Sequence, residues 1–492
     1  MSEKYFIIFI LITFGISLIL PLVYLRLHIR LKHIQKLVCM RVLRRQQKSE
    51  YTTLFSELIL NDCSKNLFYR TDKEAHQALS YLAVGKVQKA VDFFRLSNPM
   101  LSILLDAHYN SGKIYKKILK QKNRWCKNKK YGVFVPLIAY ILFDNHTMHT
   151  AITKINPQKL SKGAYAYYNY CLAASYLYDG DMLSASQKAS IALDYFRKKR
   201  YSYETSQCYL LLGEIYRLSC VNDVAQTMIE AAIKINREQK LPQLYGKSTA
   251  SLGMLMLFEN RLTEAEDKFN QALVMAQTEN LRADIHNQRA LLYLVQNKYK
   301  EAEKEVTEAL KTFNALQNIH GQAFSLQLSA QIAFSKKQFG RALKYATEAI
   351  IAYEQNGNLS AILECLYLSA DILFRQNKVK KSEELLRRII KEDKHTKHNF
   401  HVANAYSLLG LIYLQKNELQ RAKVLLQQSL HLEQRHRRCE GMVSDYTNLA
   451  LIDNLAGNRE AAKNNMQTAL DYASETGNDE LVKLIKNKLA KV

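Results

Sequence analysis

The side chains best placed for chemistry in this sequence are histidines that lie close together in the chain. His395, His398 and His401 follow two acidic residues, and His146 lies three positions before His149. Imidazole nitrogens and carboxylate oxygens at such spacings can bind a transition metal ion. A solvated polar link between two helices accounts for the same residues without any ligand. We therefore predict no metal site and no cofactor.

Motifs of the common enzyme classes are missing from the sequence. It contains no glycine-rich phosphate loop, no H-E-x-x-H pair and no G-x-S-x-G turn. Its eight cysteines include no C-x-x-C pair, which favours reduced, separately packed thiols over a zinc or redox motif. The sequence thus predicts no catalytic residues and a protein that is not an enzyme.

Positive charge is concentrated in the first quarter of the chain. The formal net charge is +25, and residues 1–130 supply +16 of it, from 24 Lys/Arg and 8 Asp/Glu. Such a basic region can bind nucleic acid, anionic lipid or an acidic protein. Nine basic residues fall in segment 113–130, which also holds Trp125, the only tryptophan. This segment predicts either a contact with a membrane surface or a solvated helix end and loop.

An uncharged run from Tyr5 to Leu25 covers 21 positions, enough for a helix to cross roughly 30 Å of hydrocarbon. No small-residue cleavage site follows it, which argues against a removable signal peptide. The flank that follows is basic and predicts a membrane-surface contact by Arg26, Arg30, Lys32, Lys36, Arg41, Arg44 and Arg45. The positive-inside rule predicts a single-pass inner or plasma membrane protein, its amino terminus outside and its bulk cytoplasmic. Because the span accounts for the charge, nucleic acid is not an expected partner.

The elements that must position any binding residues are set by a periodic pattern in the second half of the chain. Small residues recur there at intervals of 40, except for one interval of 37, and form a small-residue ladder: Ala185, Ala225, Ala265, Ala302, Ala342, Ser382, Ala422 and Ala462. Such a period is typical of a solenoid, whose units pack only on their neighbours. Gly (16) and Pro (5) are scarce, which favours an almost wholly helical chain.

One repeat unit contains two helical faces. In the unit that begins at Ser206, the faces consist of Tyr209, Leu212, Gly213 and Tyr216, then Ala225, Ile229 and Ala232. Small residues on both faces would let two antiparallel helices approach closely where they cross. This pattern resembles the tetratricopeptide repeat, in which aromatic-x-x-Leu-Gly-x-x-Tyr precedes Ala, Phe and Ala. The period differs, because it is mostly 40 here and 34 in the family.

The resemblance implies an all-α chain with a right-handed α-solenoid of tetratricopeptide-like helix pairs, and the apolar run predicts an amino-terminal transmembrane helix before it. It is strong over 165–475 and weak over 73–99 and 136–163. The predicted segments are a tail (1–4), the transmembrane helix (5–25), a basic helical stalk (26–72), degenerate repeat-like helices (73–163), an array of about eight repeats (164–475) and a capping helix (476–492).

Tetratricopeptide arrays bind other proteins, so the resemblance also implies a concave groove lined by first helices. The groove candidates in this register combine amides, charges and aromatic rings: Gln207, Glu214, Arg217, Asp284, Asn287, Gln327, Gln331, Phe334, Glu364, Tyr367, Asp371, Phe374, Asn404 and Ser407. Such a set suits a peptide or extended protein segment, although each side chain alone could simply be solvated. Lys247 has no matching Lys and Asn set in the neighbouring units, so the carboxylate grip of chaperone-tail receptors is not expected.

The sequence therefore predicts a membrane-tethered scaffold that recruits or assembles other proteins at the cytoplasmic face of a membrane. A regulator that senses a peptide or ligand in its groove is the alternative, and RNA binding by the helical array is a weaker one. Bacterial inner-membrane tetratricopeptide proteins share the layout of a short anchor and repeats. Those linked to lipopolysaccharide control also end in a C-x-x-C module, which this sequence lacks.

Overall fold

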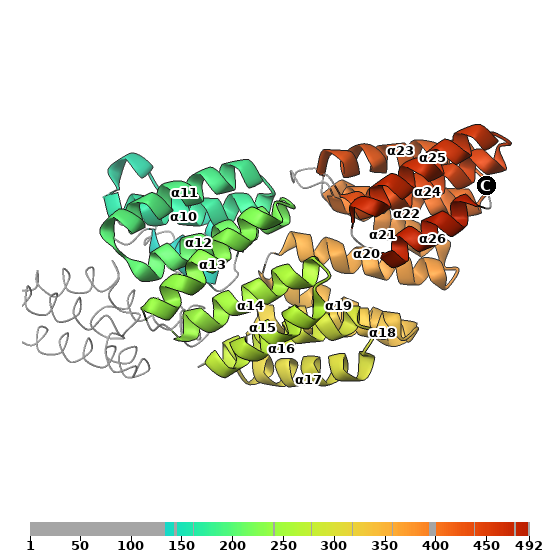
Figure 1. The fold of residues 1–492 in the computed structure, drawn as a ribbon. Coiled ribbons are helices and arrows are strands. Elements are labelled where there is room, and N and C mark those ends of the chain that lie inside the picture. Colours follow the sequence, from blue (N-terminus) through green and yellow to red (C-terminus); the bar gives the residue numbers. More distant parts are fainter. Residues whose placement is uncertain are drawn as a thin grey trace, which may run out of the picture.

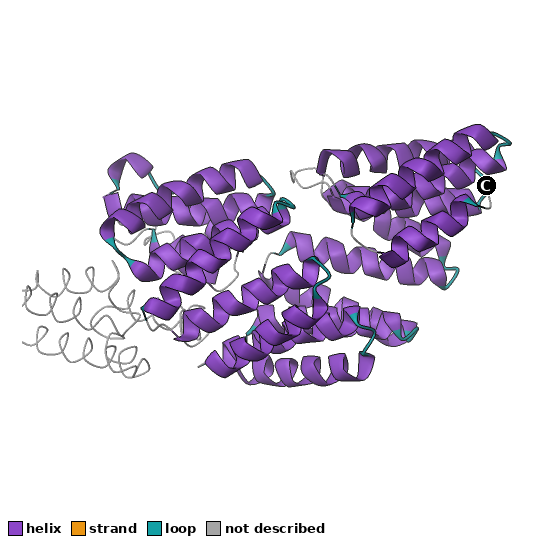
Figure 2. Cartoon of the chain, viewed as in Figure 1, coloured by secondary structure: helices purple, strands orange, loops and turns teal. Residues whose placement is uncertain are grey.

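The computed structural model describes residues 133–490, apart from 142–144, 161, 240–241, 277, 317, 357, 393–399, 437 and 477–478. This part of the chain is helical and contains no strand (Figure 2). The predicted span Tyr5–Leu25, its basic flank and segment 113–130 with Trp125 lie outside the described residues. Within the described residues, no helix has both the length and the apolar character needed to cross a bilayer.

The helices follow one another as antiparallel pairs. Two short helices and a 3-10 turn come first: α8 (Phe134–Ile141), α9 (Asn145–Ile152) and Pro157–Lys159. Eight pairs follow: α10 (Lys162–Asp179) with α11 (Met182–Lys199), α12 (Ser202–Leu218) with α13 (Asn222–Glu238), α14 (Pro242–Phe258) with α15 (Leu262–Met275), α16 (Glu279–Val295) with α17 (Tyr299–Leu316), α18 (Ile319–Ser335) with α19 (Phe339–Asn356), α20 (Leu359–Arg375) with α21 (Val379–Glu392), α22 (Phe400–Gln415) with α23 (Leu419–His436), and α24 (Cys439–Leu455) with α25 (Arg459–Glu475). A final helix, α26 (Asp479–Leu489), packs on α25 through the buried Ile485.

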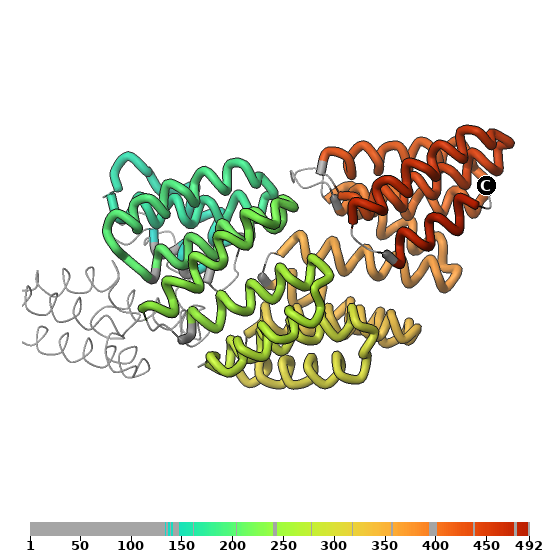
Figure 3. Tube along the Cα trace, viewed as in Figure 1, coloured from blue at the N-terminus to red at the C-terminus, as the bar shows by residue number. Residues whose placement is uncertain are grey.

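The pairs stack in chain order into a curved solenoid (Figures 1 and 3). Each second helix packs against the first helix of the next pair, and successive first helices also contact each other directly, from α10 through α24. Successive second helices approach one another less closely. This wedge-shaped packing places the first helices on the inner, concave side. The predicted all-helical solenoid is confirmed.

The small-residue ladder forms the centre of each helix pair. All eight ladder residues are fully buried. A Cβ atom added to Gly253 would lie 2.8 Å from the ring of Phe269, and one added to Gly213 would lie 2.6 Å from Ile229. Where Ala290 replaces the glycine, the facing residue is the smaller Val306. The predicted close approach of the two helices is confirmed, and in the pair α16–α17 the smaller facing residue makes room for the alanine.

Each of the eight first helices ends in the same turn. One residue of every turn adopts a left-handed backbone conformation: Gly180, Cys220, Asn260, Asn297, Lys337, Asn377, Asn417 and Gly457. The amide of the next residue donates to a carbonyl five positions earlier, as in Arg261 to Met256 at 2.9 Å. These are the bonds of a Schellman motif, which satisfies the last carbonyls of a helix. The turn residues repeat with the spacing of the ladder.

The single interval of 37 has a local cause in α15. This second helix has 14 residues, three fewer than α13, and ends where Ala276 is extended. The next pair therefore begins three residues earlier. Helix α21 is equally short, but residues 393–399 restore the usual interval before α22.

Candidate binding groove

A row of side chains at one register position follows the concave side of the array. We call it the central row: Gln207, Lys247, Asp284, Phe324, Glu364 and Asn404, on α12, α14, α16, α18, α20 and α22. Their spacing is that of the repeats, with 37 between Lys247 and Asp284. Lys247 and Glu364 are exposed and the other four are half-buried, so all six are accessible to a partner.

The charges of the central row are desolvated although they are accessible. Desolvation by surrounding protein raises the pKa of Asp284 to about 7, against the opposing effect of Lys247. The same cause lowers the pKa of Lys247 and raises the pKa of the exposed Glu364. Protein atoms can desolvate an accessible charge only when they surround it on several sides. These pKa shifts are consistent with a row that lies on the inner side of the array, close to atoms of the neighbouring helices.

Lys247 and Asp284 have opposite charges but are not an ion pair: within the described part of the chain, no contact of 4.0 Å or less joins them. Their hydrogen bonds are long ones to amides. Lys247 Nζ donates to Gln207 Oε1 at 3.5 Å, and Asn280 Nδ2 donates to Asp284 Oδ2 at 3.5 Å. Both groups thus keep most of their hydrogen-bonding capacity for another molecule.

Two other predicted groove charges are already paired within their own helices. Arg217 forms a bidentate pair with Glu214 at 2.6 and 2.9 Å, and its guanidinium lies 4.3 Å from the ring of Phe258. Asp371 pairs with Arg375 at 2.9 Å. These residues lie toward the far ends of their first helices, where their charge is largely neutralised. They offer less to a charged partner than the central row does.

Two predicted groove amides are buried against neighbouring helices. Asn287 is 1% exposed and accepts a hydrogen bond from Ser325 of the next first helix at 3.0 Å. Gln327 is 5% exposed and accepts one from Tyr353 at 2.7 Å. The first bond joins successive repeats, and the second joins the two helices of the pair α18–α19. Both stabilise the packing, since a buried amide without a partner would cost free energy. The geometry leaves them little surface for a ligand.

The remaining predicted residues are half-buried along the first helices. Gln331 and Phe374 lie there, and Phe334 lies 5.0 Å below the guanidinium of Arg375. Tyr367 is half-buried, and desolvation raises its pKa to about 12. Asn404, the last member of the central row, accepts a hydrogen bond from Arg438 at 3.3 Å. The structure thus brings a mixed aromatic and polar set to the groove.

Sequence reasoning missed Phe324 and two asparagines next to the central row. Asn318 Nδ2 donates to Asn280 Oδ1 at 2.7 Å and links α18 to α16 on the concave side. Phe324 could have been found by counting 40 positions from Asp284. Lys247 had drawn notice only for its lack of a matching set, although the short interval after it brings Asp284 into its register.

No metal centre emerges from the described part of the chain, where no three His, Cys, Asp or Glu side chains gather closely enough to hold an ion. His401 is buried, and its Nε2 lies 2.9 Å from Ser360 Oγ, a contact between successive first helices. His395 and His398 lie outside the described residues.

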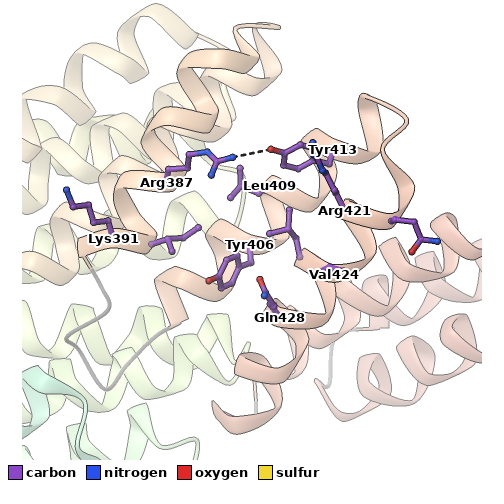
Figure 4. Close-up of a pocket in the computed structure, with 11 residues that line it drawn as sticks. Arg387, Lys391, Tyr406, Leu409, Tyr413, Arg421, Val424 and Gln428 are labelled. Carbon is purple, nitrogen blue, oxygen red and sulfur yellow. Dashed lines mark hydrogen bonds between the residues drawn. The ribbon is translucent and has the colours of Figure 1, made fainter.

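An open cavity of about 670 Å³ lies between α21 and α23, with α22 as its floor (Figure 4). Leu409 and Val424 line it together with three basic side chains. Arg387 is bonded to Tyr413 at 3.1 Å and to Glu383, and Arg421 pairs with Glu418. Because this cavity lies beside the second helices, it is separate from the concave groove.

A buried acidic pair lies where α23 meets α24. Glu433 and Asp445 are 2% and 1% exposed, and desolvation raises their pKa values to about 7 and about 6. Arg438 donates to Glu433 Oε1 at 3.2 Å, and Ser407 donates to Asp445 Oδ1 at 2.6 Å. The second oxygen of each carboxyl has no hydrogen-bond partner among the described residues. Arg438 thus forms an ion pair with Glu433, whereas Asp445 has no ion pair among the described residues.

These features define the class of the protein. The class is an α-solenoid of helix pairs whose inner side carries a row of accessible polar side chains. Residues 403–436, which span most of α22 and all of α23, match the family described as tetratricopeptide repeat. The same pair geometry and ladder recur from α10 to α25. Residues 403–436 therefore form a tetratricopeptide repeat, and the other pairs of the array share its geometry.

Solved structures with similar folds share little sequence with this chain. The Rap protein complexed with competence and sporulation factor has 13% identity and a TM-score of 0.46, over 83% of this chain and 99% of that chain. A tetratricopeptide repeat protein from Parabacteroides merdae has 17% identity and a TM-score of 0.35, over 54% and 93%. PilF of Pseudomonas aeruginosa has 13% identity and a TM-score of 0.33, over 49% and 97%. With TM-scores below 0.5, these likenesses say nothing about function, and comparison with curated proteins finds no match.

Proposed function

We propose that this protein is a scaffold that holds a segment of another protein in its concave groove and thereby recruits that protein. The observation that carries the proposal is the central row, whose charged side chains are accessible, desolvated and free of ion pairs with each other. Such groups gain most from a partner that supplies the missing hydrogen bonds.

A photo-crosslinking amino acid placed in the groove tests this proposal. Position 324 lies in the central row, and position 274 on α15 is a matched control, because Val274 is 78% exposed on a second helix. We expect irradiation of cells to yield a discrete protein adduct from position 324 and none from position 274. Adducts of equal pattern from both positions, or none from either, would contradict a groove-based scaffold.

The site of recruitment is the second part of the proposal. A span at Tyr5–Leu25 with a basic flank would place the array at the cytoplasmic face of a membrane. A reporter fused after Val492 tests this topology. Activity of a reporter that works only in the cytoplasm supports it, and activity of one that works only outside the cytoplasm refutes it. Extraction of the full chain by high salt alone would argue against the span itself.

A sensing function is the alternative, and the contacts between successive first helices favour it. Lys247 bonds Gln207, and Asn318 bonds Asn280, across neighbouring repeats on the concave side. A ligand that replaced these bonds would change the spacing of the repeats. A pull-down from membranes separates the two functions. One stoichiometric protein partner supports the scaffold, whereas recovery of only a small peptide, with a raised melting temperature, supports the sensor.

A further inference from the structure

The two acidic members of the central row are the least neutralised charges of the groove. Asp284 receives one hydrogen bond, from the amide of Asn280 at 3.5 Å. An amide donates a hydrogen bond but supplies no charge. Among the described residues, neither carboxylate has a cation within 4.0 Å, in contrast to Glu214 and Asp371 at the groove edge.

An aromatic ring separates these two carboxylates. Phe324 lies on α18, between Asp284 on α16 and Glu364 on α20, in the same register and half-buried. The groove therefore presents acid, ring and acid on three successive first helices. Packed helix axes are about 8–10 Å apart, and an extended chain in the polyproline II conformation advances about 3.1 Å per residue with every third side chain on the same face. One step along the row thus corresponds to about three residues of an extended partner.

We propose that the groove binds an extended peptide segment with two basic side chains about six residues apart and an apolar side chain midway between them. The basic side chains pair with Asp284 and Glu364, and the apolar one packs on Phe324. Lys247, one step beyond Asp284, takes a backbone carbonyl or a carboxylate of the same segment. The basic side chains of the peptide supply charged donors to Asp284 and Glu364, two carboxylates that the fold leaves without a counter-ion. This inference rests on the groove being the binding surface proposed above.

The net charge of the row determines the direction of selectivity. Lys247 is the single cation among the six residues, against two carboxylates. An acidic segment would meet repulsion at both carboxylates and attraction at only one end. A basic segment is attracted by both carboxylates and repelled only by Lys247. The groove should therefore prefer basic over acidic segments, even though the protein as a whole is strongly basic.

Fluorescence anisotropy with two capped nonapeptides tests the inference on the full chain. The basic probe is GRGSFSGRG, and the acidic probe is GEGSFSGEG, both N-acetylated, C-amidated and dye-labelled. We expect the basic probe to bind and the acidic probe to bind at least about tenfold more weakly. The double variant Asp284→Asn with Glu364→Gln should weaken the basic probe by roughly ten- to a hundredfold. Glu308→Gln, at an exposed position on α17, is the control and should change nothing.

Charge reversal adds a positive result that a folding defect cannot imitate. Asp284→Lys with Glu364→Lys should bind the acidic probe in preference to the basic one. Equal binding of the two probes to the wild type, or no binding of the basic probe at millimolar concentration, would overturn the inference. If position 324 still crosslinks a protein in that case, the groove remains the binding surface and only the proposed chemistry fails. If both tests are negative, the proposed function fails as well.

Discussion

Raising the pH should loosen the α23–α24 junction, because a buried acidic pair lies there. Glu433 binds a proton up to a pKa of about 7, whereas an unfolded glutamate releases it at about 4.3. The folded chain therefore holds more protons than the unfolded chain between these values, and stability falls as pH rises through them. From pH 5.5 to pH 8, the linkage relation gives a loss of about 2 kcal/mol for this group.

The substitution Glu433→Gln should remove most of this pH dependence. A glutamine keeps the shape of the side chain and can still accept from Arg438, but it has no proton to lose in this range. Asp445, with a pKa of about 6, would retain a smaller dependence of the same sign. Glu308→Gln, at the exposed position on α17, should leave the wild-type behaviour unchanged.

Hydrogen exchange of the α23 and α24 amides, corrected for intrinsic exchange, is the appropriate assay. A global transition would mix in other repeats, since repeat arrays open locally. It would also include His320 on α18, whose pKa is lowered to about 4 by burial and whose effect on stability has the opposite sign. Protection in α23 and α24 that stays constant or rises from pH 5.5 to pH 8 would refute the reasoning.

Three further substitutions test the packing rules of the array, each followed by hydrogen exchange of its own helix pair. Gly253→Ala should destabilise its pair by about 1–3 kcal/mol, because the new methyl group would meet the ring of Phe269 at 2.8 Å, and Phe269→Val in the same chain should recover part of the loss. Asn297→Ala should cost about 1–2 kcal/mol, because Asn297 is left-handed at φ 58°. Lys337→Gly, in the equivalent turn, should instead stabilise by about 0.5–1 kcal/mol. If Asn297→Ala and Lys337→Gly changed the stability of their helix pairs in the same direction, the conformational explanation would be wrong.

The ladder was predictable from sequence because its requirement is local. A position where two helices cross admits only a small side chain in every repeat, so Ala265 and Ser382 mark the same place whatever surrounds them. The groove was less predictable because accessibility depends on the following repeat. Asp284 and Asn287 lie three residues apart on one helix, yet Asn287 is buried against Ser325 and Asp284 is accessible. Both side chains are polar, so residue type alone does not predict which of the two is buried.

The turns illustrate a second limit of sequence reasoning. Four of the eight left-handed positions are asparagine and two are glycine, which a search for turn residues at a fixed interval could have found. Cys220 and Lys337 interrupt this recurrence of turn-forming residues, because neither residue type favours the left-handed conformation by itself. At these two positions, the surrounding helices impose the backbone geometry on an unsuited residue.

The identical turns also have a genetic consequence. Because Asn377 and Asn417 have the same left-handed backbone, deletion of residues 378–417 would join one turn to the next without a change of geometry. Duplication of the same 40 residues would lengthen the array by one pair in the same way. Recombination within such a gene therefore yields longer or shorter arrays that still fold. One such event would change the number of first helices that line the groove, whereas a point mutation changes a single side chain.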